Sequence, residues 1–322
     1  MISRLVFLFI ILLFSFSCED TKKVEDTELN KFKMYHIVVL GSSTAEGLGA
    51  NYSWVDRFRD KLKWIDAEHK VTNLAKAGYN SFNYLPDGTQ ISNNELIDSK
   101  RNITKAISLN PDFIILNNPS NDIWLEDYNI DTLFKNYNLI IVEAKSANIP
   151  LYITTSQPTL YQENERNKLI KINSRSRSEF YDIFIDFWSN LSKEDGSTIE
   201  TYRSNDDVHL NDAAHYIFAK RVLEKLPLDL DEATKDKVIH YYSNWDEVNL
   251  HYQDDDDAWT ISPGIKMEKE AENWFKVVIK DEARVFFVFN DGANWDNNND
   301  KNYKSTLKEL WVKDGNIYDK KP

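Results

Sequence analysis

Polar residues that could catalyse acyl transfer follow the ends of several predicted strands. Ser43 comes directly after the first strand, and Asn121 follows the third. Further along, Asp206 stands three residues before His209, ahead of the last predicted helix. An alcohol is a weak nucleophile unless a base removes its proton, and a histidine that a carboxylate orients can act as that base. These residues therefore indicate a serine nucleophile assisted by an aspartate–histidine pair.

The negative charge that develops during acyl transfer needs hydrogen-bond donors close to the nucleophile. The backbone N–H groups of Ser43 and Gly78 and the side-chain amide of Asn121 are candidates, because each of these residues follows a predicted strand. Ligands bind at the carboxyl ends of the strands in open parallel sheets, so we expect all of these groups at one rim. Asp207 is an alternative to Asp206 as the partner of the histidine.

The elements that position these residues alternate between short apolar runs and amphipathic stretches, from Tyr35 to about Leu226. Near-continuous apolar strands separated by helices predict an α/β fold, with a parallel sheet covered on both faces. The expected strands are His36–Leu40, Lys70–Leu74, Asp112–Asn117, Leu151–Thr155 and Tyr181–Phe187. The expected helices are Ser53–Ile65, Glu95–Ser108, Asp131–Ala147, Glu163–Glu179 and Asp212–Lys225.

Four segments of this region resemble, in order, the sequence blocks of the SGNH (GDSL-type) hydrolase family. They are residues 41–47, 73–80, 117–122 and 206–211, and the resemblance covers about residues 34–226. It implies a flavodoxin-like three-layer α/β/α parallel sheet and ester hydrolysis without a metal or cofactor. The implied catalytic residues are Ser43, Asp206 and His209, and the implied oxyanion hole consists of Ser43, Gly78 and Asn121.

Two positions depart from the family pattern. Ser42 stands where the family has an aspartate before the nucleophile, and Pro119 stands where it has a glycine. Neither change removes a catalytic atom, but both alter the loops that shape the site. The Asp-x-x-His spacing of the family favours Asp206 over Asp207 as the orienting carboxylate.

The sequence changes character after Leu226. A charged segment at 229–236 is the expected linker, and residues 237–322 contain β-rich runs with little helical periodicity. This pattern predicts an all-β sandwich module of ordinary domain size. Its expected strands are Val238–Tyr242, Glu247–Tyr252, Trp274–Ile279, Arg284–Asn290 and Leu307–Val312.

Two tryptophans of this module lie in polar segments where a large ring has little core to enter. Trp295 is surrounded by asparagines, and Trp259 follows the acidic run Asp254–Asp257. Exposed aromatic rings with polar surroundings mark interaction surfaces, and a flat indole can stack on the apolar face of a pyranose. Trp274 instead fits a strand and is expected in the core. The acidic run is expected to be a solvated loop, with calcium coordination as the alternative.

The order of aromatic and asparagine residues between positions 248 and 303 resembles the starch-binding modules of carbohydrate-binding families 25 and 26. The resemblance covers about residues 236–318 and includes the run Phe-Asn-Asp-Gly-Ala-Asn-Trp-Asp-Asn-Asn, which ends at Asn298. It implies an α-glucan partner such as starch. The implied binding residues are His251, Trp259 and Trp295, with Asn290 and Asn297 beside them.

The chain begins with a pattern typical of exported proteins. Arg4 precedes an apolar run, Leu5–Phe16, that is shorter than the roughly 20 residues of a bilayer span. The residues before Cys18 resemble a bacterial lipoprotein lipobox, which implies lipidation of this cysteine. We therefore expect a signal peptide at 1–18, a polar tether at 19–32 and a lipid anchor in the bacterial cell envelope, at the outer membrane or cell surface. A plain signal peptide with an incidental cysteine is the alternative.

Composition and charge restrict the function further. Hydrophobic residues make up 42% of the 322 positions and charged residues 28%, which is typical of a globular protein. The net charge of −13 repels phosphate backbones, so we expect no nucleic-acid partner. The sequence lacks the residue spacings of zinc sites and dinucleotide-binding folds, and we expect no metal or cofactor.

Together these observations predict an exported serine esterase that removes acyl groups, with acetyl favoured, from carbohydrate. Its hydrolase domain is expected at 33–228, and the module at 237–322 directs it to starch-like α-glucan. Two alternatives remain open. The chain could be a non-catalytic α-glucan-binding lipoprotein with a vestigial hydrolase fold, or the hydrolase could be a lipase or thioesterase, because the SGNH family includes both.

Overall fold

The computed structural model describes residues 33–91, 94–118, 120–125, 128–230, 236–254, 258–280 and 282–322. The predictions for Cys18, the signal peptide, the tether, Pro119 and most of the linker and of the acidic run concern residues outside these ranges. Within the described ranges, no helix has the length and the apolar character that a membrane span requires.

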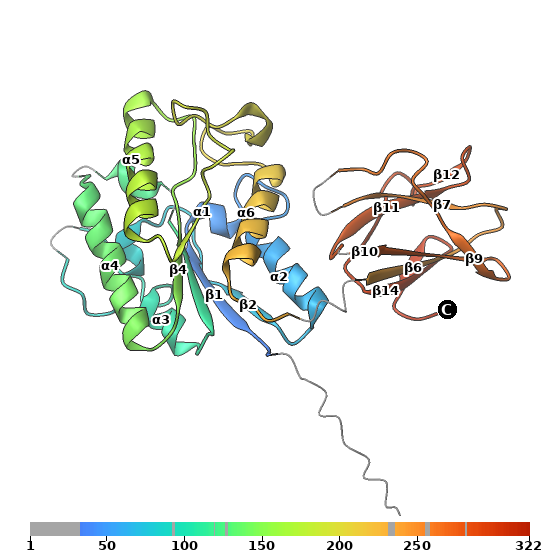
Figure 1. The fold of residues 1–322 in the computed structure, drawn as a ribbon, viewed down its shortest axis with the longest axis horizontal. Helices are drawn as coiled ribbons and strands as arrows, with labels where there is room; N and C mark the ends of the chain where they lie inside the picture. Colours follow the sequence, from blue (N-terminus) through green and yellow to red (C-terminus); the bar gives the residue numbers. More distant parts are fainter. Residues whose placement is uncertain are drawn as a thin grey trace, which may run out of the picture. The chain divides into compact units, whose positions relative to one another are not determined.

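The first domain is built around five parallel strands (Figure 1). The strands are β1 His36–Gly41, β2 Lys70–Asn73, β3 Phe113–Asn117, β4 Leu151–Thr154 and β5 Phe184–Ile185. Their order is β2-β1-β3-β4-β5, and every neighbouring pair is parallel. This is the flavodoxin-like order, whose switch point lies between β1 and β3. The predicted fold class is confirmed, and the segments that follow β1 and β3 emerge side by side.

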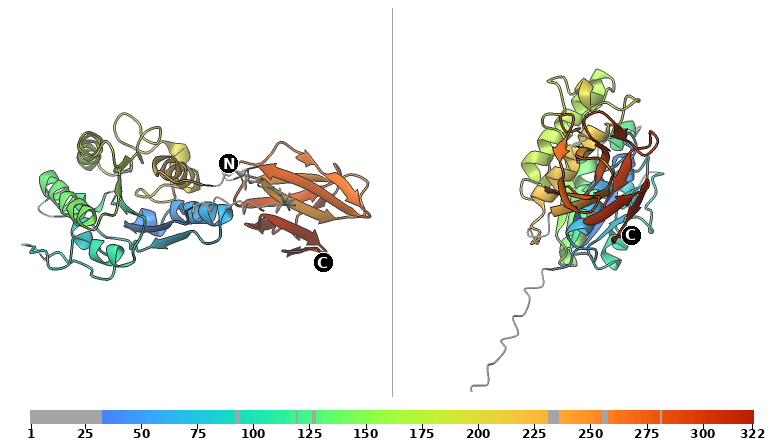
Figure 2. Two further views of the ribbon diagram at one scale, coloured as in Figure 1. Left: turned by 60° about the horizontal axis from the view of Figure 1, so that its bottom comes forward. Right: turned by 90° about the vertical axis from the view of Figure 1, so that its right-hand side faces the viewer.

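Helices cover both faces of this sheet, because alternate residues of a strand point to opposite sides. Val38 and Leu40 of β1 belong to one core, whereas Ile37 and Val39 belong to another. The helices are α1 Ser43–Glu46, α2 Trp54–Ile65, α3 Ile103–Ser108, α4 Ile130–Ser146, α5 Glu163–Glu179 and α6 Asp212–Lys225. Helices α3, α4 and α5 pack into the first core, and α2 and α6 pack into the second (Figures 1 and 2).

Side-chain caps set where several of these helices begin. Ser53 and Asn129 accept hydrogen bonds from backbone N–H groups in the first turns of α2 and α4. Asn211 caps α6 in the same way, directly after the Asp-x-x-His segment. A cap of this kind typically contributes about 1 kcal/mol. Because Asn211 fixes the start of α6, it also fixes the end of the loop that carries His209.

Two expected elements differ from the structure. The helix expected at 95–108 begins only at Ile103, because Asn102 caps it there. Strand β5 is shorter than the expected 181–187, since it lies at the edge of the sheet and pairs with β4 alone. Three 3₁₀ helices have no counterpart among the expected elements. They are η1 Ser81–Tyr84, η2 Asn121–Trp124 and η3 Glu200–Tyr202.

The C-terminal module is a sandwich of two sheets, as predicted. One sheet has the order β15-β14-β6-β10-β9, and the other has the order β12-β11-β7-β8, with β13 paired to β11. Side chains of both sheets share one core, in which Tyr241 of β6 stacks on Phe289 of β11 at a centroid distance of 3.7 Å. Trp274 is buried in β10, as expected.

Five of the described strands of the module correspond to the expected strands. Five others are too short to show an alternation of apolar and polar residues. The corresponding strands are β6 Asp236–Tyr242, β7 Asn249–Gln253, β10 Trp274–Lys280, β11 Val285–Asn290 and β14 Glu309–Lys313. The short ones are β8 Ile265–Lys266, β9 Glu268–Ala271, β12 Trp295–Asp296, β13 Tyr303–Ser305 and β15 Asn316–Tyr318.

Candidate active site and aromatic surface

Ser43, His209 and Asp206 form a continuous hydrogen-bonded chain. The Nε2 atom of His209 lies 2.8 Å from Ser43 Oγ, and its Nδ1 atom lies 2.8 Å from Asp206 Oδ2. A carboxylate can only accept, so Nδ1 carries the proton and Nε2 accepts from the serine hydroxyl. The alternative residue, Asp207, accepts a hydrogen bond at its backbone carbonyl from the backbone N–H of Leu160 at 2.8 Å. It is Asp206 that orients the imidazole, as the spacing predicts.

Ser43 stands at a tight turn between β1 and α1 and is 8% exposed. Gly41 permits the turn, because a β-carbon there would lie 2.5 Å from Ala45 Cβ and 3.1 Å from the carbonyl oxygen of Asn117. The backbone N–H of Ser42 donates to that same carbonyl, which continues the contact between β1 and the end of β3 up to the nucleophile. As the first residue of α1, Ser43 has a backbone N–H without an acceptor in its own helix.

Asp206 organises the loop that carries His209. Its Oδ1 atom accepts from the backbone N–H groups of Val208 at 2.8 Å and His209 at 2.7 Å, and from the Ser204 hydroxyl at 3.1 Å. Burial by itself raises the pKa of Asp206, but the hydrogen bonds from His209 and Val208 outweigh burial and lower the pKa to about 2. The carboxylate is therefore charged at neutral pH.

A residue that the sequence reasoning missed, Gln157, links the nucleophile turn to the histidine loop. Its side chain is buried. The Oε1 atom accepts from the hydroxyl of Thr44 at 2.8 Å, and Nε2 donates to the carbonyl of Val208 at 3.2 Å. One amide thus holds the chain neighbours of both Ser43 and His209. Gln157 follows the end of β4, so the strand-end criterion that selected the other site residues could have found it.

Gly49 was also missed, and it brings a second loop against the histidine. Its φ angle is +91°, and a β-carbon there would lie 2.5 Å from His209 Cβ and 2.5 Å from the carbonyl oxygen of Leu210. A side chain at this position would meet both backbone strain and a clash. The sequence signal is the pair of glycines at 47 and 49, close behind the nucleophile.

The other two predicted oxyanion donors lie on segments that hydrogen bonds hold together. Asn121 Nδ2 donates to the carbonyl of Tyr79 at 2.8 Å, so the turn after β3 meets the turn that contains Gly78. The backbone N–H of Ala77 donates to the Glu46 carboxylate of α1 at 2.6 Å, which ties that turn to the nucleophile helix. Gly78 has a φ angle of +82°, and among the described residues its N–H has no acceptor. That N–H and the second amide hydrogen of Asn121 can donate hydrogen bonds to an oxyanion.

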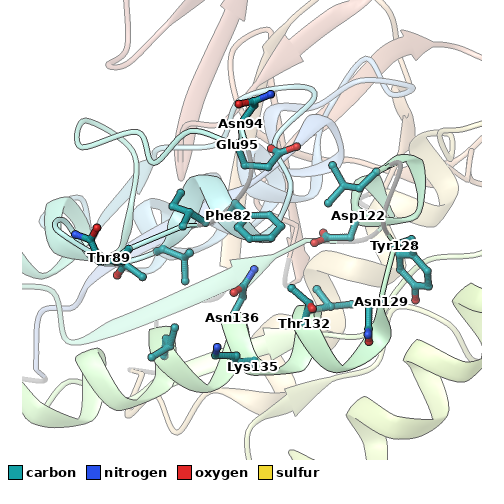
Figure 3. A pocket seen from close by; sticks show the side chains of 16 residues that line it. Phe82, Thr89, Asn94, Glu95, Asp122, Tyr128, Asn129, Thr132, Lys135 and Asn136 are labelled. Carbon is teal, nitrogen blue, oxygen red and sulfur yellow. The ribbon is translucent and has the colours of Figure 1, made fainter.

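The buried carboxylate of Asp122 fixes the turn that carries Asn121. It accepts from the backbone N–H of Ser81 at 3.1 Å and from Asn118 Nδ2 at 2.7 Å. Burial raises the pKa of Asp122, and the hydrogen bonds from Ser81 and Asn118 oppose this effect. Asp122 also lines a cavity of about 810 Å³ formed by residues of η1, η2, α4 and the loop between η1 and α3 (Figure 3). Most of its lining residues are polar, with Asn136 among them.

In the C-terminal module, the three predicted aromatic residues meet on one surface. The ring of His251 in β7 lies 4.9 Å from that of Trp259 and 5.6 Å from that of Trp295 in β12, measured between centroids. The two indoles are 39% and 46% exposed. His251 Nδ1 lies 2.9 Å from the Thr260 hydroxyl, and burial lowers the pKa of this histidine. We call these three rings the aromatic surface.

Trp295 is anchored through the next residue, Asp296. The carboxylate of Asp296 accepts from the hydroxyl of Tyr241 at 2.8 Å and from that of Tyr303 at 2.9 Å. Burial and this nearby carboxylate raise the pKa of both tyrosines, so both remain protonated donors. The core of the module therefore sets the position of β12 and of its exposed indole.

The asparagines expected beside these rings make structural contacts. Asn290 is 0% exposed, its Nδ2 donates to the carbonyl of Pro263 at 2.8 Å, and its Oδ1 accepts from Gly292 N at 3.1 Å. A buried, bonded amide cannot reach a ligand, so the structure contradicts the prediction for Asn290. The amide of Asn297 bonds to the carboxylate of Asp300 at 2.8 Å and closes its own turn.

The acidic run has one described residue, Asp254, which accepts from the backbone N–H of Ala258 at 3.0 Å and closes the loop before Trp259. The calcium alternative depends on the three residues that follow Asp254, which lie outside the described ranges. In the part of the chain that the structure describes, no group of three or more histidine, cysteine, aspartate or glutamate side chains could hold a metal ion.

Comparison with known proteins identifies the family of the first domain. The model of the GDSL-like lipase/acylhydrolase family matches residues 39–217, which is more than half of the chain. The chain belongs to this family. A GDSL-like lipase from Bacteroides thetaiotaomicron is similar in structure, with 18% sequence identity and a TM-score of 0.43 over 59% of this chain and 88% of that one. The resemblance of the four sequence blocks is thus confirmed at the level of the family.

The C-terminal part of the chain is similar to segments of amylases. A beta/alpha-amylase of Paenibacillus polymyxa is 33% identical over 91 residues, which are 27% of this chain and 8% of the amylase. A CBM25 from the Bacillus halodurans amylase, solved in complex with maltotetraose, is 33% identical over 27% of this chain and 98% of that one, with a TM-score of 0.26. The chain therefore spans only a small part of the curated amylase that it matches.

Proposed function

We propose that this GDSL-family protein is a serine esterase that removes acyl groups, with acetyl favoured, from carbohydrate. The observation that carries the proposal is the hydrogen-bonded chain from Ser43 Oγ through His209 to Asp206. The bond between Ser43 Oγ and His209 Nε2, at 2.8 Å, is of a length at which a proton can pass from the serine to the imidazole.

In the proposed mechanism, His209 Nε2 takes the hydroxyl proton as Ser43 Oγ attacks the ester carbonyl carbon. The carbonyl oxygen becomes an oxyanion and accepts from the N–H groups of Ser43 and Gly78 and from the Asn121 amide. The proton on Nε2 then passes to the oxygen of the leaving alcohol, and an acyl ester remains on Ser43. A water molecule, deprotonated by the same nitrogen, attacks this ester. The bond between the acyl carbon and Ser43 Oγ then breaks, the proton on Nε2 returns to Oγ, and the carboxylic acid is released.

The negatively charged Asp206 supports this sequence of steps because it stabilises the imidazolium that forms twice. Its pKa of about 2 means that it stays ionised while the proton moves between Ser43 and His209.

The test is hydrolysis of p-nitrophenyl acetate by the full chain, compared with Ser43→Ala. Asn121→Ala is the second variant, and it should lower kcat by about 10²–10³ if its amide stabilises the oxyanion. Equal rates for the wild type and Ser43→Ala would reject the serine mechanism. Faster hydrolysis of long-chain acyl esters or thioesters than of acetylated sugars would favour a lipase or thioesterase instead.

We propose further that the C-terminal module holds the enzyme on starch-like α-glucan. The support is the aromatic surface of His251, Trp259 and Trp295, together with the sequence similarity to an amylase segment. Tethering of this kind raises the local substrate concentration without adding contacts at the catalytic centre.

The double substitution Trp259→Ala, Trp295→Ala should abolish retention on insoluble amylose while the rate on p-nitrophenyl acetate stays unchanged. Undiminished retention would show that the ligand binds elsewhere. Retention by the wild type without any esterase activity would instead favour the non-catalytic glucan-binding alternative.

The proposed location is the bacterial cell envelope, at the outer membrane or cell surface, with the lipid anchor on Cys18. It rests on the sequence pattern before this cysteine. Metabolic labelling with a fatty acid should mark the wild-type chain and leave Cys18→Ala unlabelled. Equal labelling of the two chains would rule out lipidation at this position.

A further inference from the structure

The side chain of Trp124 is exposed although it is one of the largest apolar groups of the hydrolase domain. It is 55% exposed, whereas Trp54 and Trp64 of the same domain are buried. Single exposed apolar side chains are common, so exposure alone carries no function. What distinguishes Trp124 is its position relative to the proposed active site.

Trp124 shares a turn with an oxyanion residue. It is the last residue of η2, and Asn121 is the first. In a 3₁₀ helix, side chains three residues apart lie above one another, about 6 Å apart along the axis. The two residues between them, Asp122 and Ile123, are buried in the domain. Trp124 and Asn121 therefore lie on the same side of this turn, opposite the two buried residues.

The indole is held in place from the side of the histidine loop. Its Nε1–H donates to the hydroxyl of Tyr161 at 3.3 Å, and the two rings meet edge to face with centroids 4.7 Å apart. Tyr161 is buried, and burial raises its pKa, so its hydroxyl stays protonated. The preceding residue, Leu160, donates its backbone N–H to the carbonyl of Asp207 at 2.8 Å. Trp124 thus lies between the turn of Asn121 and the loop of His209.

This position lies on the path of the leaving alcohol. In the proposed mechanism the alcohol oxygen receives its proton from His209, so the remainder of the alcohol must extend along the side of the site that this loop forms. A fixed indole, more than half of whose surface is open to solvent, offers that alcohol a flat apolar face.

We propose that Trp124, supported by Tyr161, is a subsite that stacks on the pyranose ring of the acylated sugar. The proposal rests on the proposed esterase function and names the group that the catalytic domain itself recognises, independently of the C-terminal module. The apolar C–H face of the sugar packs on the indole, and the sugar hydroxyls remain in solvent.

The test compares Trp124→Ala and Trp124→Tyr with the wild-type full chain on two substrates, methyl acetate and an acetylated maltotetraose. For Trp124→Ala we expect KM for the acetylated sugar to rise about tenfold, the loss expected for one aromatic stacking contact, with little change in kcat. Its kcat/KM for methyl acetate, whose small leaving alcohol cannot stack on the indole, should stay within about twofold of the wild type. Trp124→Tyr should keep most of the affinity for the acetylated sugar because a ring remains.

The matched control is Tyr181→Ala. Tyr181 is 73% exposed and precedes β5, so it lies at the amino end of the strands, away from the catalytic rim. This variant should hydrolyse both substrates with the kcat and KM of the wild type. Retention of Trp124→Ala on amylose should also be unchanged, which separates the subsite from the module.

Three results would overturn the subsite. The first is an unchanged KM for the acetylated sugar in Trp124→Ala. The second is an equal loss on both substrates, which would show a structural role for the indole. The third is a selective loss on methyl octanoate, which would assign the indole to an acyl chain. Failure of the esterase function itself would appear differently, as no Ser43-dependent hydrolysis by the wild type.

Discussion

Gly49 and His209 are in such close contact that there is no room for a β-carbon between them. The added atom would lie 2.5 Å from His209 Cβ, at a backbone φ angle of +91°. The loop after α1 therefore limits where the imidazole of His209 can stand. This contact makes a residue without any reactive group part of the geometry of the site.

Gly49→Ala should push the imidazole away from Ser43. Because a misplacement of about 1 Å can cost about 10² in rate, we expect a fall of that order in kcat on p-nitrophenyl acetate. Gly88→Ala is the control, since Gly88 also has a positive φ angle, +81°, but a β-carbon there would have no neighbour within 4 Å. A similar loss in both variants would mean that backbone strain, and not displacement of His209, is responsible.

Gln157→Leu should lower kcat about tenfold or more, because it leaves the Thr44 hydroxyl and the Val208 carbonyl without their buried partner. Thr44→Val removes the same bridge from its other end, whereas Thr44→Ser keeps the hydroxyl and serves as the control. If the bridge acts as a unit, the double variant Thr44→Val, Gln157→Leu should lose no more than the worse single variant. Additive losses in this double-mutant cycle would show that the two residues act separately.

Asp186 is expected to make stability depend on pH at the acid end. It accepts from Arg177 at 2.9 Å and from the backbone N–H groups of Trp188 at 2.8 Å and Ser189 at 3.0 Å. Burial raises its pKa, but the hydrogen bonds from these residues prevail and lower the pKa to about 2, from an ordinary value of 3.8. A carboxylate whose pKa is lowered by folding stabilises the folded state above its unfolded pKa, and this contribution is lost as pH falls toward 2.

Asp186→Asn should therefore reduce the free energy of unfolding by about 2 kcal/mol at pH 7, and the difference should shrink between pH 4 and pH 2. Urea unfolding at several pH values measures both effects. Asp182→Asn, at an exposed position nearby in the chain, is the control and should change little. A difference that stays constant down to pH 2 would contradict a lowered pKa.

Asp296→Ala should weaken glucan binding although Asp296 does not belong to the aromatic surface. Without this carboxylate, the hydroxyls of Tyr241 and Tyr303 lose their acceptor and β12 no longer holds Trp295 in place. We expect reduced retention on amylose, with unchanged hydrolysis of p-nitrophenyl acetate. The exposed Asp319 offers a control, and Asp319→Ala should bind amylose like the wild type. Normal retention by Asp296→Ala would show that Trp295 is held by other contacts.

Local features of the sequence were sufficient to predict most of the longer helices and strands and the residue types of the proposed site. Apolar runs marked the central strands, and Ser53 and Asn211 marked the starts of α2 and α6, because strand alternation and helix capping depend on residues close together in the chain. The prediction of a helix at 95–108 was wrong over its first half, because Asn102 caps the helix and it begins only at Ile103.

Contacts between distant segments decided the rest. Whether Asp206 or Asp207 reaches the imidazole depends on the backbone hydrogen bonds of one loop, and neither choice changes the hydrophobic pattern. Asn290 stands at the end of strand β11, but its side chain is buried and donates to the carbonyl of Pro263.

By itself, the sequence determined which residues of the proposed site the chain carries and which loops of the α/β domain carry them. Only the tertiary structure decided that Gln157 and Gly49 hold these groups in register, and that Trp124 stays exposed beside them. The physical reason is that periodicity and capping act within a few residues. The hydrogen bonds between Thr44 and Gln157 and between Ser43 and His209 instead join segments that lie 113 and 166 positions apart in the chain.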